Sequence, residues 1–396
     1  AVLNDQRVLD PFSASVLVGD PEVQKKAAEI CTSDLFPPSS SPLCSVSDYG
    51  HDRIRVAYLS ADYHEHATSY LMAELFESHD PAEFETYAIS FGPDAQGGRM
   101  RQRLVKAFDH FIDVREKTDR EVAELLRAHE IDIAIDLKGY TADARPGILS
   151  HRPCPVQVQY LGFPGTMGAP YIDYIIADDV IIPESHEQYY TEQVVRLPGC
   201  YQPYDSTRKI SSRIPSRADE GLPESGYVYC CFNNNYKITP EMFDVWMEVL
   251  RADPESVLWL YEGNQEAPDN LRFEAQKRGI DPARLIFASK KPIEEHLARH
   301  TLADLFLDTV PCNAHTTCRD ALVAGVPVLT MMGDTFASRV AASLGQTVES
   351  GVIVADDFES YQSIAVAKPD VKVVPKTHQD FNQGYFQLLA RLRSWH

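Results

Sequence analysis

Short apolar segments that read as buried strands alternate with amphipathic helical segments along most of this chain. Expected strands of a first series lie at residues 55–59, 84–90, 110–114, 131–137, 156–161 and 174–177, with helical patterns at 69–78 and 119–129. A second series has expected strands at 227–232, 257–261, 285–288, 304–308 and 326–331. Strands that alternate with helices form parallel sheets covered on both faces. The pattern therefore predicts an α/β fold with two doubly wound units.

The division into two units agrees with the length of 396 residues, which is long for one hydrophobic core. A polar stretch at 200–225, with several Pro, Ser and Arg residues, marks the expected boundary. The predicted domains are an N-terminal segment and linker at 1–50, an N-terminal Rossmann-like lobe at 51–205, a C-terminal Rossmann-like lobe at 206–372, and a C-terminal helix at 373–396. Ligands of such folds bind at the carboxyl ends of the strands.

The formal net charge of −21 argues against a nucleic-acid partner and against an anionic membrane surface. No apolar run approaches the ~20 residues of a membrane span, and the first residues lack the pattern of a signal peptide. The eight cysteines show no C-x-x-C pair. We therefore expect reduced cysteines, a cytoplasmic location and no bound metal.

The segment 305–322 carries the strongest indication of a ligand. It reads as a buried strand, a polar loop, and a helix that opens on Thr316 and Thr317. A helix N-terminus offers unpaired N–H groups and the positive end of the helix dipole to an anion. His315 adds an imidazole before the helix, and Asp320 lies one turn further, where a carboxylate could accept hydrogen bonds from a sugar diol. Phosphate and ribose together indicate a nucleotide.

Four further polar segments follow expected strands. Segment 60–69 contains His66, 161–166 contains Gly165, 232–240 contains Asn234, Tyr236 and Lys237, and 290–299 contains His296 and Arg299. No Asp-x-Asp triplet, which often holds a divalent ion in sugar transferases, occurs in the chain. Lys237, Arg299 and the helix at Thr316 are predicted to stabilise a leaving diphosphate instead, so that no metal is required.

Five ordered segments, at 53–62, 161–166, 232–237, 307–317 and 337–343, resemble the catalytic region of the O-GlcNAc transferase and SPINDLY family, in its bacterial type without tetratricopeptide repeats. The resemblance runs from about residue 51 to about residue 345. It implies a GT-B fold, in which two Rossmann-like lobes face a central cleft. It also implies transfer of GlcNAc from UDP-GlcNAc to Ser/Thr hydroxyls of proteins, with inversion at the anomeric carbon.

The resemblance also implies roles for individual residues. Lys237 resembles the essential lysine on the β-phosphate, His296 the histidine against the uracil, and Arg299 a neighbouring arginine. The other donor-binding positions are Asn234, where animal enzymes have Gln, together with His315, Thr316, Thr317, Asp320 and Gly165. His66 and Tyr236 are the candidates for the base that removes the acceptor proton.

Some positions depart from the animal enzymes and keep alternatives open. Ile293 stands where those enzymes have Lys. Tyr70 stands where they have a second His, and SPINDLY-type O-fucosyltransferases also have Tyr there. One alternative is therefore an O-fucosyltransferase that uses GDP-fucose, although His315 favours UDP-GlcNAc. A sugar-nucleotide epimerase would need a pair of acid/base carboxylates, and no convincing pair follows the expected strands. The last alternative is a non-catalytic scaffold that binds nucleotide sugars.

Overall fold

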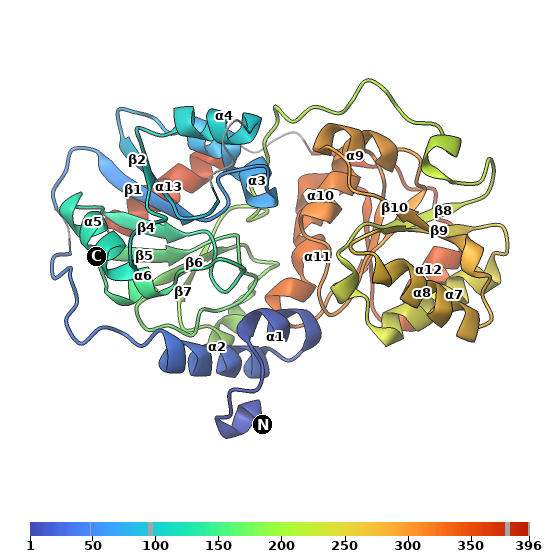
Figure 1. The fold of residues 1–396 in the computed structure, drawn as a ribbon, viewed down its shortest axis with the longest axis horizontal. Helices are drawn as coiled ribbons and strands as arrows, with labels where there is room; N and C mark the ends of the chain where they lie inside the picture. The colour runs from blue at the N-terminus through green and yellow to red at the C-terminus, as the bar shows by residue number, and fades with distance from the viewer. Residues whose placement is uncertain (48, 94–97, 377–380, 395–396) are drawn as a thin grey trace. The chain divides into compact units, whose positions relative to one another are not determined.

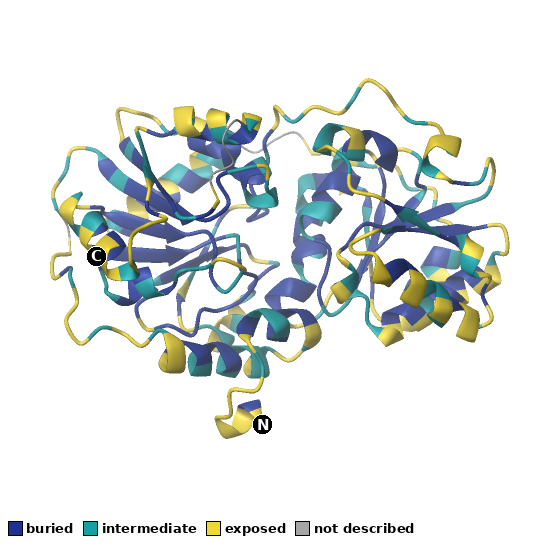
Figure 2. Ribbon diagram, viewed as in Figure 1, coloured by how far each residue is buried: buried dark blue, intermediate teal, exposed yellow. Residues whose placement is uncertain are grey.

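The computed structural model describes residues 1–47, 49–93, 98–376 and 381–394. The chain divides into two compact units, one of Ala1–Thr207 with His378–His396 and one of Arg208–Thr377 (Figure 1). Each unit has its own sheet, and the strands are mostly buried while the outward faces of the helices are exposed (Figure 2). The prediction of an α/β fold with two parallel sheets is therefore confirmed.

The first unit contains a seven-stranded parallel sheet in the order β3-β2-β1-β4-β5-β6-β7. Strand β1 lies near its centre, and its burial on both faces explains its nearly continuous apolar sequence. The strands are β1 (Ile54–Ser60), β2 (Phe84–Ser90), β3 (His110–Asp113), β4 (Ile133–Asp136), β5 (Val156–Gln159), β6 (Tyr174–Ala177) and β7 (Gln193–Arg196).

The helices of the first unit begin at clear sequence signals. Asp10 and Asp20 accept hydrogen bonds from backbone N–H groups at the starts of α1 and α2, each of which has Pro at its first turn. Thr118 and Glu121 form a capping box at α5. The helices are α1 (Pro11–Leu17), α2 (Pro21–Leu35), α3 (Ala67–Glu77), α4 (Arg99–Ala107), α5 (Asp119–Ala128), α6 (Gly147–Ser150) and α13 (Phe381–Ser394).

The second unit contains a six-stranded parallel sheet in the order β10-β9-β8-β11-β12-β14, and a small antiparallel pair β13-β15. Strands β8 and β11 occupy its centre. The strands are β8 (Val228–Cys231), β9 (Val257–Tyr261), β10 (Leu285–Ala288), β11 (Leu305–Leu307), β12 (Val328–Met331), β13 (Val348–Ser350), β14 (Val352–Ala355) and β15 (Val374–Pro375). The helices are α7 (Pro240–Ala252), α8 (Glu266–Lys277), α9 (Ile293–His300), α10 (Thr316–Val323), α11 (Val340–Leu344) and α12 (Phe358–Val366).

All expected strands are present, with ends that differ by at most two residues. The sequence interpretation missed β7, β14 and the β13-β15 pair. Strands β7 and β14 lie at sheet edges, and each buries only one of its four residues. β7 has only two apolar residues, whereas β14 is apolar throughout and its pattern alone could have marked it. The Pro/Ser-rich stretch at 36–42 has no helix or strand, as expected. Helices α1 and α2 before it belong to the first unit.

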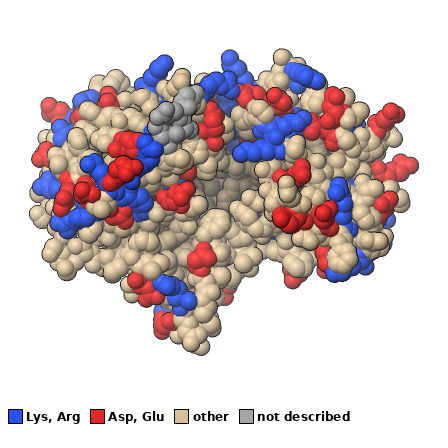
Figure 3. All heavy atoms as spheres, viewed as in Figure 1, with Lys and Arg blue, Asp and Glu red and all other residues tan. Residues whose placement is uncertain are grey.

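The described helices include none that is both long enough and apolar enough to cross a membrane. All eight cysteines lie in the described ranges and are buried, and none of them forms a disulfide bond. Acidic and basic side chains are interspersed over the surface of each unit that Figure 3 shows.

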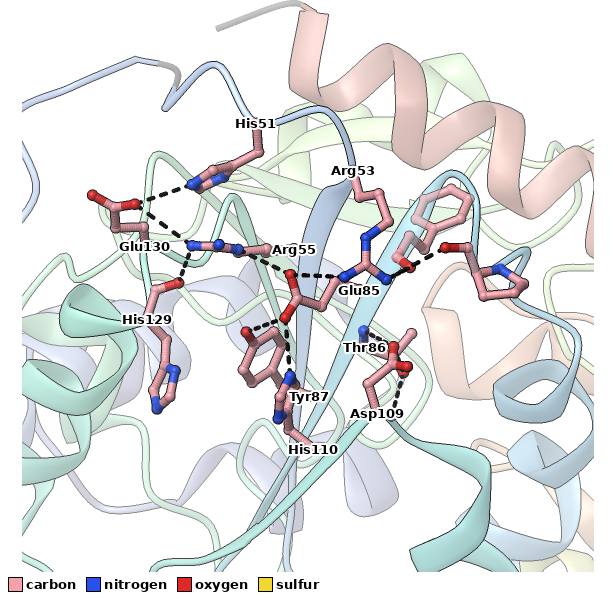
Figure 4. A network of polar contacts seen from close by, with 12 residues as sticks. His51, Arg53, Arg55, Glu85, Thr86, Tyr87, Asp109, His110, His129 and Glu130 are labelled. Atoms are coloured by element: carbon pink, nitrogen blue, oxygen red, sulfur yellow. Dashed lines mark hydrogen bonds and ion pairs between the residues drawn. The ribbon is translucent and has the colours of Figure 1, made fainter.

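A polar network joins the first three strands of the first sheet near their amino ends (Figure 4). The carboxylate of Glu85 accepts hydrogen bonds from Arg55 Nε at 3.1 Å and Tyr87 Oη at 2.9 Å, and it lies 2.9 Å from His110 Nε2. Burial would raise the pKa of Glu85, but these contacts outweigh it and lower the pKa to about 2. The network therefore stabilises the folded state through the ionised carboxylate.

We predict that Glu85→Gln lowers the melting temperature most at neutral pH. The stabilisation by Glu85 is fully present above its unfolded pKa of 4.5 and is lost as the pH falls toward the folded pKa of about 2. The difference in melting temperature between wild type and Glu85→Gln, followed by circular dichroism, should therefore shrink between pH 5 and about pH 2. Glu124→Gln, which removes a carboxylate from an exposed pair on α5, is the control. A difference that is equal at pH 7 and pH 3 would contradict the prediction.

Candidate functional site

The segments that follow β8 and β11 meet at one edge of the second sheet, because these two parallel strands are direct neighbours. Residues 232–239 lead from β8 to α7, and residues 308–315 lead from β11 to α10. Doubly wound sheets bind ligands at this carboxyl edge. Most of the residues that the sequence singles out in the second unit lie in these two segments or in α9 and α10.

Lys237 ends a short 3-10 helix, Asn235–Lys237, after β8. Its Nζ donates a hydrogen bond to the main-chain oxygen of Asn313, at 2.6 Å, in the loop after β11. Burial alone would lower the pKa of Lys237, but Cys312, Tyr236 and Asp308 lie near it, and the pKa is raised. The amine is therefore a cation at neutral pH. None of the ion pairs among the described residues includes Lys237, so its charge is available to an anion.

Helix α10 begins at Thr316, as the sequence predicts, and His315 is its N-cap residue. The His315 side chain accepts no hydrogen bond from the first backbone N–H groups of α10. Thr317 Oγ1 donates to Asn233 Oδ1, which joins the helix start to the segment after β8. Burial and the Lys237 cation hold the pKa of His315 well below its ordinary value, so this imidazole is neutral. The helix dipole and Lys237 together make this edge positive.

The buried carboxylate of Asp308 shapes the loop before α10. Its Oδ1 accepts hydrogen bonds from the backbone N–H groups of Thr309 at 2.7 Å and Ala314 at 2.6 Å. Asn233 Nδ2 also donates to Oδ1, at 3.2 Å, and Thr330 Oγ1 donates to Oδ2 at 2.6 Å. Burial raises the pKa of Asp308. Four donors therefore converge on one side chain and fix the path of residues 309–314.

His296 and Arg299 lie on one face of α9, as their spacing predicts. Arg299 is fully buried and donates from Nε and Nη2 to His296 Nδ1, at 3.1 and 2.7 Å, and from Nη1 to the Ser289 carbonyl. Because a guanidinium can only donate, His296 Nδ1 accepts, and the imidazole proton lies on Nε2. Burial, then the neighbouring His300, Arg299 and Arg208, lower the pKa of His296 to about 2. Arg299 thus fixes the orientation and the tautomer of His296.

Asp320 lies in α10 and is nearly buried. Its Oδ1 accepts a hydrogen bond from Arg208 Nη2 at 2.7 Å, and both side chains are less than one-tenth exposed. His300 of α9 is fully buried and donates from Nδ1 to the His296 carbonyl. The charges of Asp320 and Arg208 lie near His300. The expected ribose carboxylate is therefore held by an arginine of the same unit.

His66 and Gly165 belong to the first unit. His66 is the N-cap of α3, and its Nδ1 accepts a hydrogen bond from the Thr68 backbone N–H. Gly165 lies in the buried turn after β5, where its N–H bonds to the Phe163 carbonyl. A Cβ on the neighbouring Gly162 would meet the Leu137 carbonyl oxygen at 1.9 Å, so the backbone of this turn lies against residue 137 and requires glycine there.

The two remaining candidates are more open to solvent. Asn234 is exposed, and Tyr236 is 49% exposed. Burial of the phenol oxygen raises the pKa of Tyr236, although the adjacent Lys237 acts in the opposite direction.

Sequence reasoning did not select Asn233, Asp308, Arg208 or His300. Asn233 and Asp308 each follow a central strand within two residues, so their position alone could have marked them. The pairing of Arg208 with Asp320 joins residues 112 positions apart, and no local pattern predicts it.

The chain has two units, each built on a doubly wound parallel sheet, and the second has a lysine cation at the carboxyl edge of its sheet. This is the architecture of GT-B glycosyltransferases. The model of glycosyl transferase family 41 matches residues 24–209 and 205–377. The chain therefore belongs to glycosyl transferase family 41, and the predicted membership of the O-GlcNAc transferase and SPINDLY family is confirmed.

Three similar proteins show the extent of the match. An Arabidopsis thaliana protein described as "Probable UDP-N-acetylglucosamine--peptide N-acetylglucosaminyltransferase SEC" is 36% identical over 93% of this chain. A Petunia hybrida SPINDLY protein is 32% identical over 78% of it. The structure of a mutant Thermobaculum terrenum O-GlcNAc transferase matches 97% of this chain and 72% of that one, with a TM-score of 0.78 and 28% identity. The chain spans only 40% and 34% of the lengths of the two plant relatives.

We predict that Asp308→Ala loosens the loop before α10. Each buried donor left without a partner costs about 1–3 kcal/mol, so the second unit should melt several degrees lower. Hydrogen exchange should speed up most at the amides of residues 309–314, and little at β9 on the other side of β8. The control Asp334→Ala removes an exposed carboxylate from the same sheet edge. Unchanged exchange at Thr309 and Ala314 would show that Asp308 does not organise the loop.

Proposed function

We propose that this chain is an inverting glycosyltransferase that moves GlcNAc from UDP-GlcNAc to Ser/Thr hydroxyls of proteins without a metal ion. The observation that carries the proposal is the Lys237 cation, which forms no ion pair among the described residues and lies at the same strand edge as the start of α10, which the His315 side chain does not cap. Such an edge suits a diphosphate, because preorganised N–H groups and a fixed cation stabilise negative charge.

The proposed reaction is a single displacement at the anomeric carbon. The acceptor hydroxyl oxygen forms a bond to this carbon while the bond to the UDP oxygen breaks, and the acceptor proton passes to a base. The electron pair remains on the β-phosphate of UDP. Lys237 and the N–H groups at Thr316 and Thr317 stabilise that charge as it develops.

The nucleoside end of the donor is assigned to His296 and Asp320. Arg299 fixes His296 with its proton on Nε2, so that the imidazole offers a hydrogen-bond donor to the base. Asp320 offers a carboxylate to the ribose diol, and Arg208 sets its orientation. Asn234, His315 and Gly165 complete the proposed donor contacts.

The names of the relatives support this choice of substrates. The plant SEC protein is named for UDP-N-acetylglucosamine as donor and a peptide as acceptor, and the Thermobaculum protein is called an O-GlcNAc transferase. We accordingly propose a nucleotide sugar and a protein or peptide as the partners, and a cytoplasmic location.

The assignment of the base is less direct. The raised pKa of Tyr236 keeps its phenol protonated at neutral pH, which disfavours it as a base. His66 remains a candidate for contact with the substrates.

The donor is tested by calorimetry and nucleotide release with UDP-GlcNAc, UDP-Glc, UDP-GalNAc and GDP-fucose, each in the presence of EDTA and a peptide library as acceptor. We expect selective binding of UDP-GlcNAc and UDP release that EDTA does not reduce. Preference for GDP-fucose would assign the chain to the fucosyltransferases instead. Loss of turnover in EDTA, restored by a divalent ion, would overturn the metal-free mechanism.

The role of Lys237 is tested by Lys237→Met. This variant should lose turnover about 10²–10³-fold, the effect of removing one preorganised group that stabilises developing charge. Its affinity for UDP-GlcNAc should fall much less, because the other donor contacts remain. Lys277→Met, on the exposed face of α8, is the matched control. Turnover in Lys237→Met equal to that of the control would refute the assignment.

A further inference from the structure

A buried ion pair lies at the carboxyl edge of the first sheet. Asp62 follows β1 and Lys138 follows β4, and these two strands are neighbours. Lys138 Nζ lies 2.9 Å from both carboxylate oxygens of Asp62, and the two side chains are only 5% and 8% exposed. The Lys138 N–H in turn bonds to the buried carboxylate of Asp136 at 2.8 Å. Both partners of the pair are therefore fixed by the strand ends.

The ion pair is in contact with His66. Asp62 Oδ2 lies 3.4 Å from His66 Nδ1, and the Thr68 backbone N–H donates to the same nitrogen at 3.3 Å. A backbone N–H can only donate, so Nδ1 carries a lone pair, and the proton of the neutral imidazole lies on Nε2. Two lone-pair acceptors, Nδ1 and a carboxylate oxygen, thus face each other.

This arrangement requires a compensating charge. An isolated carboxylate at 3.4 Å would favour a proton on Nδ1, as in an Asp–His pair in which the carboxylate orients a base. Lys138 satisfies both oxygens of Asp62 and removes that preference. Nδ1 then remains free to cap α3.

We propose that Lys138 is a positioning residue for His66: by pairing with Asp62, it holds His66 as the tautomer that carries its proton on Nε2. His66 then offers a hydrogen-bond donor to a substrate oxygen, and its Nε2 does not act as a base. The tautomer itself does not depend on the proposed function. Only its consequence for the transfer reaction rests on that function.

The other charged groups near His66 agree with this assignment. Burial lowers the pKa of His66, and Lys138 and the adjacent His64 lower it further, while Asp62 alone acts to raise it. The next carboxylate along the chain, Glu65, is engaged elsewhere: it accepts hydrogen bonds from Tyr70 Oη and from the Met100 N–H of α4. His66 is therefore neutral at pH 7.

The test is nitrogen-15 NMR of the imidazole side chains, with pH titration, on the full chain without substrate. A His66→Gln sample identifies the signals of His66. We expect the wild type to carry its proton on Nε2 and to titrate below its ordinary pKa of 6.5. A wild type with its proton on Nδ1 would overturn the proposal.

Three variants should move the pKa of His66 in different directions. Lys138→Met leaves Asp62 unpaired, so the pKa should rise by about one unit and the proton should move to Nδ1. Asp62→Asn leaves the Lys138 cation alone, so the pKa should fall. The double variant Asp62→Asn/Lys138→Met removes both charges and should return the pKa toward the wild-type value.

The double variant keeps the proposal testable if Lys138→Met does not fold, because a buried charge without its partner is strongly destabilising. In that case Asp62→Asn and the double variant must still differ, with the lower pKa in the single variant. Lys26→Met, a lysine on α2 paired with Asp5, is the control. Equal His66 titration in Asp62→Asn, the double variant and the control would refute the proposal.

Activity provides a separate readout. If the chain is the transferase proposed above, Lys138→Met should reduce kcat and add to the pH–rate profile an ionisation that the Lys26→Met profile lacks. If the chain does not transfer GlcNAc at all, the NMR titrations still decide whether Lys138 sets the tautomer of His66. The two proposals can therefore fail independently.

Discussion

The candidate donor site depends on one buried carboxylate, Asp308. It follows the central strand β11 and accepts hydrogen bonds from residues at the carboxyl ends of both neighbouring strands: from Asn233 after β8 and from Thr330 in β12. It also binds the backbone of the loop that leads to α10. The carboxyl ends of three adjacent strands are thus held to a single side chain. The position of Lys237, which donates to the Asn313 carbonyl of that loop, follows from this arrangement.

Lys237 differs from the buried cations of the chain because no carboxylate is paired with it among the described residues. The chain has a net charge of −21, and most cations inside it have an acidic partner. Lys138 pairs with Asp62, Arg208 with Asp320, and Arg299 lies 3.7 Å from Glu220. Lys237 donates a hydrogen bond to a neutral carbonyl and contacts the Cys312 side chain, and none of the ion pairs among the described residues includes it. A dianionic phosphate would therefore find at Lys237 a charge that no described carboxylate already satisfies.

The sequence predicted the repeated elements well because central parallel strands are buried on both faces and read as apolar runs. The edge strand β7 was missed because it has only two apolar residues, whereas β14 was missed although its sequence, Val352–Ala355, is apolar throughout. Local spacing also predicted that His296 and Arg299 share a helix face. It could not show that Arg299 points inward, because the Ser289 carbonyl that it binds belongs to the segment after β10.

Contacts between distant parts of the chain were beyond sequence reasoning. The Lys138–Asp62 pair joins residues 76 positions apart, and the Arg208–Asp320 pair joins residues 112 apart. Neither residue of the first pair stands out in its own segment, since a single Lys or Asp in a loop is ordinary. Only the parallel pairing of β1 with β4 brings them together. The function of a charged side chain therefore depends on its partner more than on its type.

A histidine occupies the N-cap position of a helix in each unit, but only one of the two side chains caps its helix. In the first unit, the His66 side chain accepts a hydrogen bond from an N–H group at the start of α3, which leaves fewer donors there for an anion. In the second unit, His315 occupies the same N-cap position of α10, but its side chain forms no such bond. Its Nε2 instead lies 3.5 Å from the Ala337 carbonyl. The His315 side chain therefore does not cap the start of α10, and Lys237 lies near it. These two observations support the assignment of the phosphate site to the second unit and of a hydrogen-bonding histidine to the first.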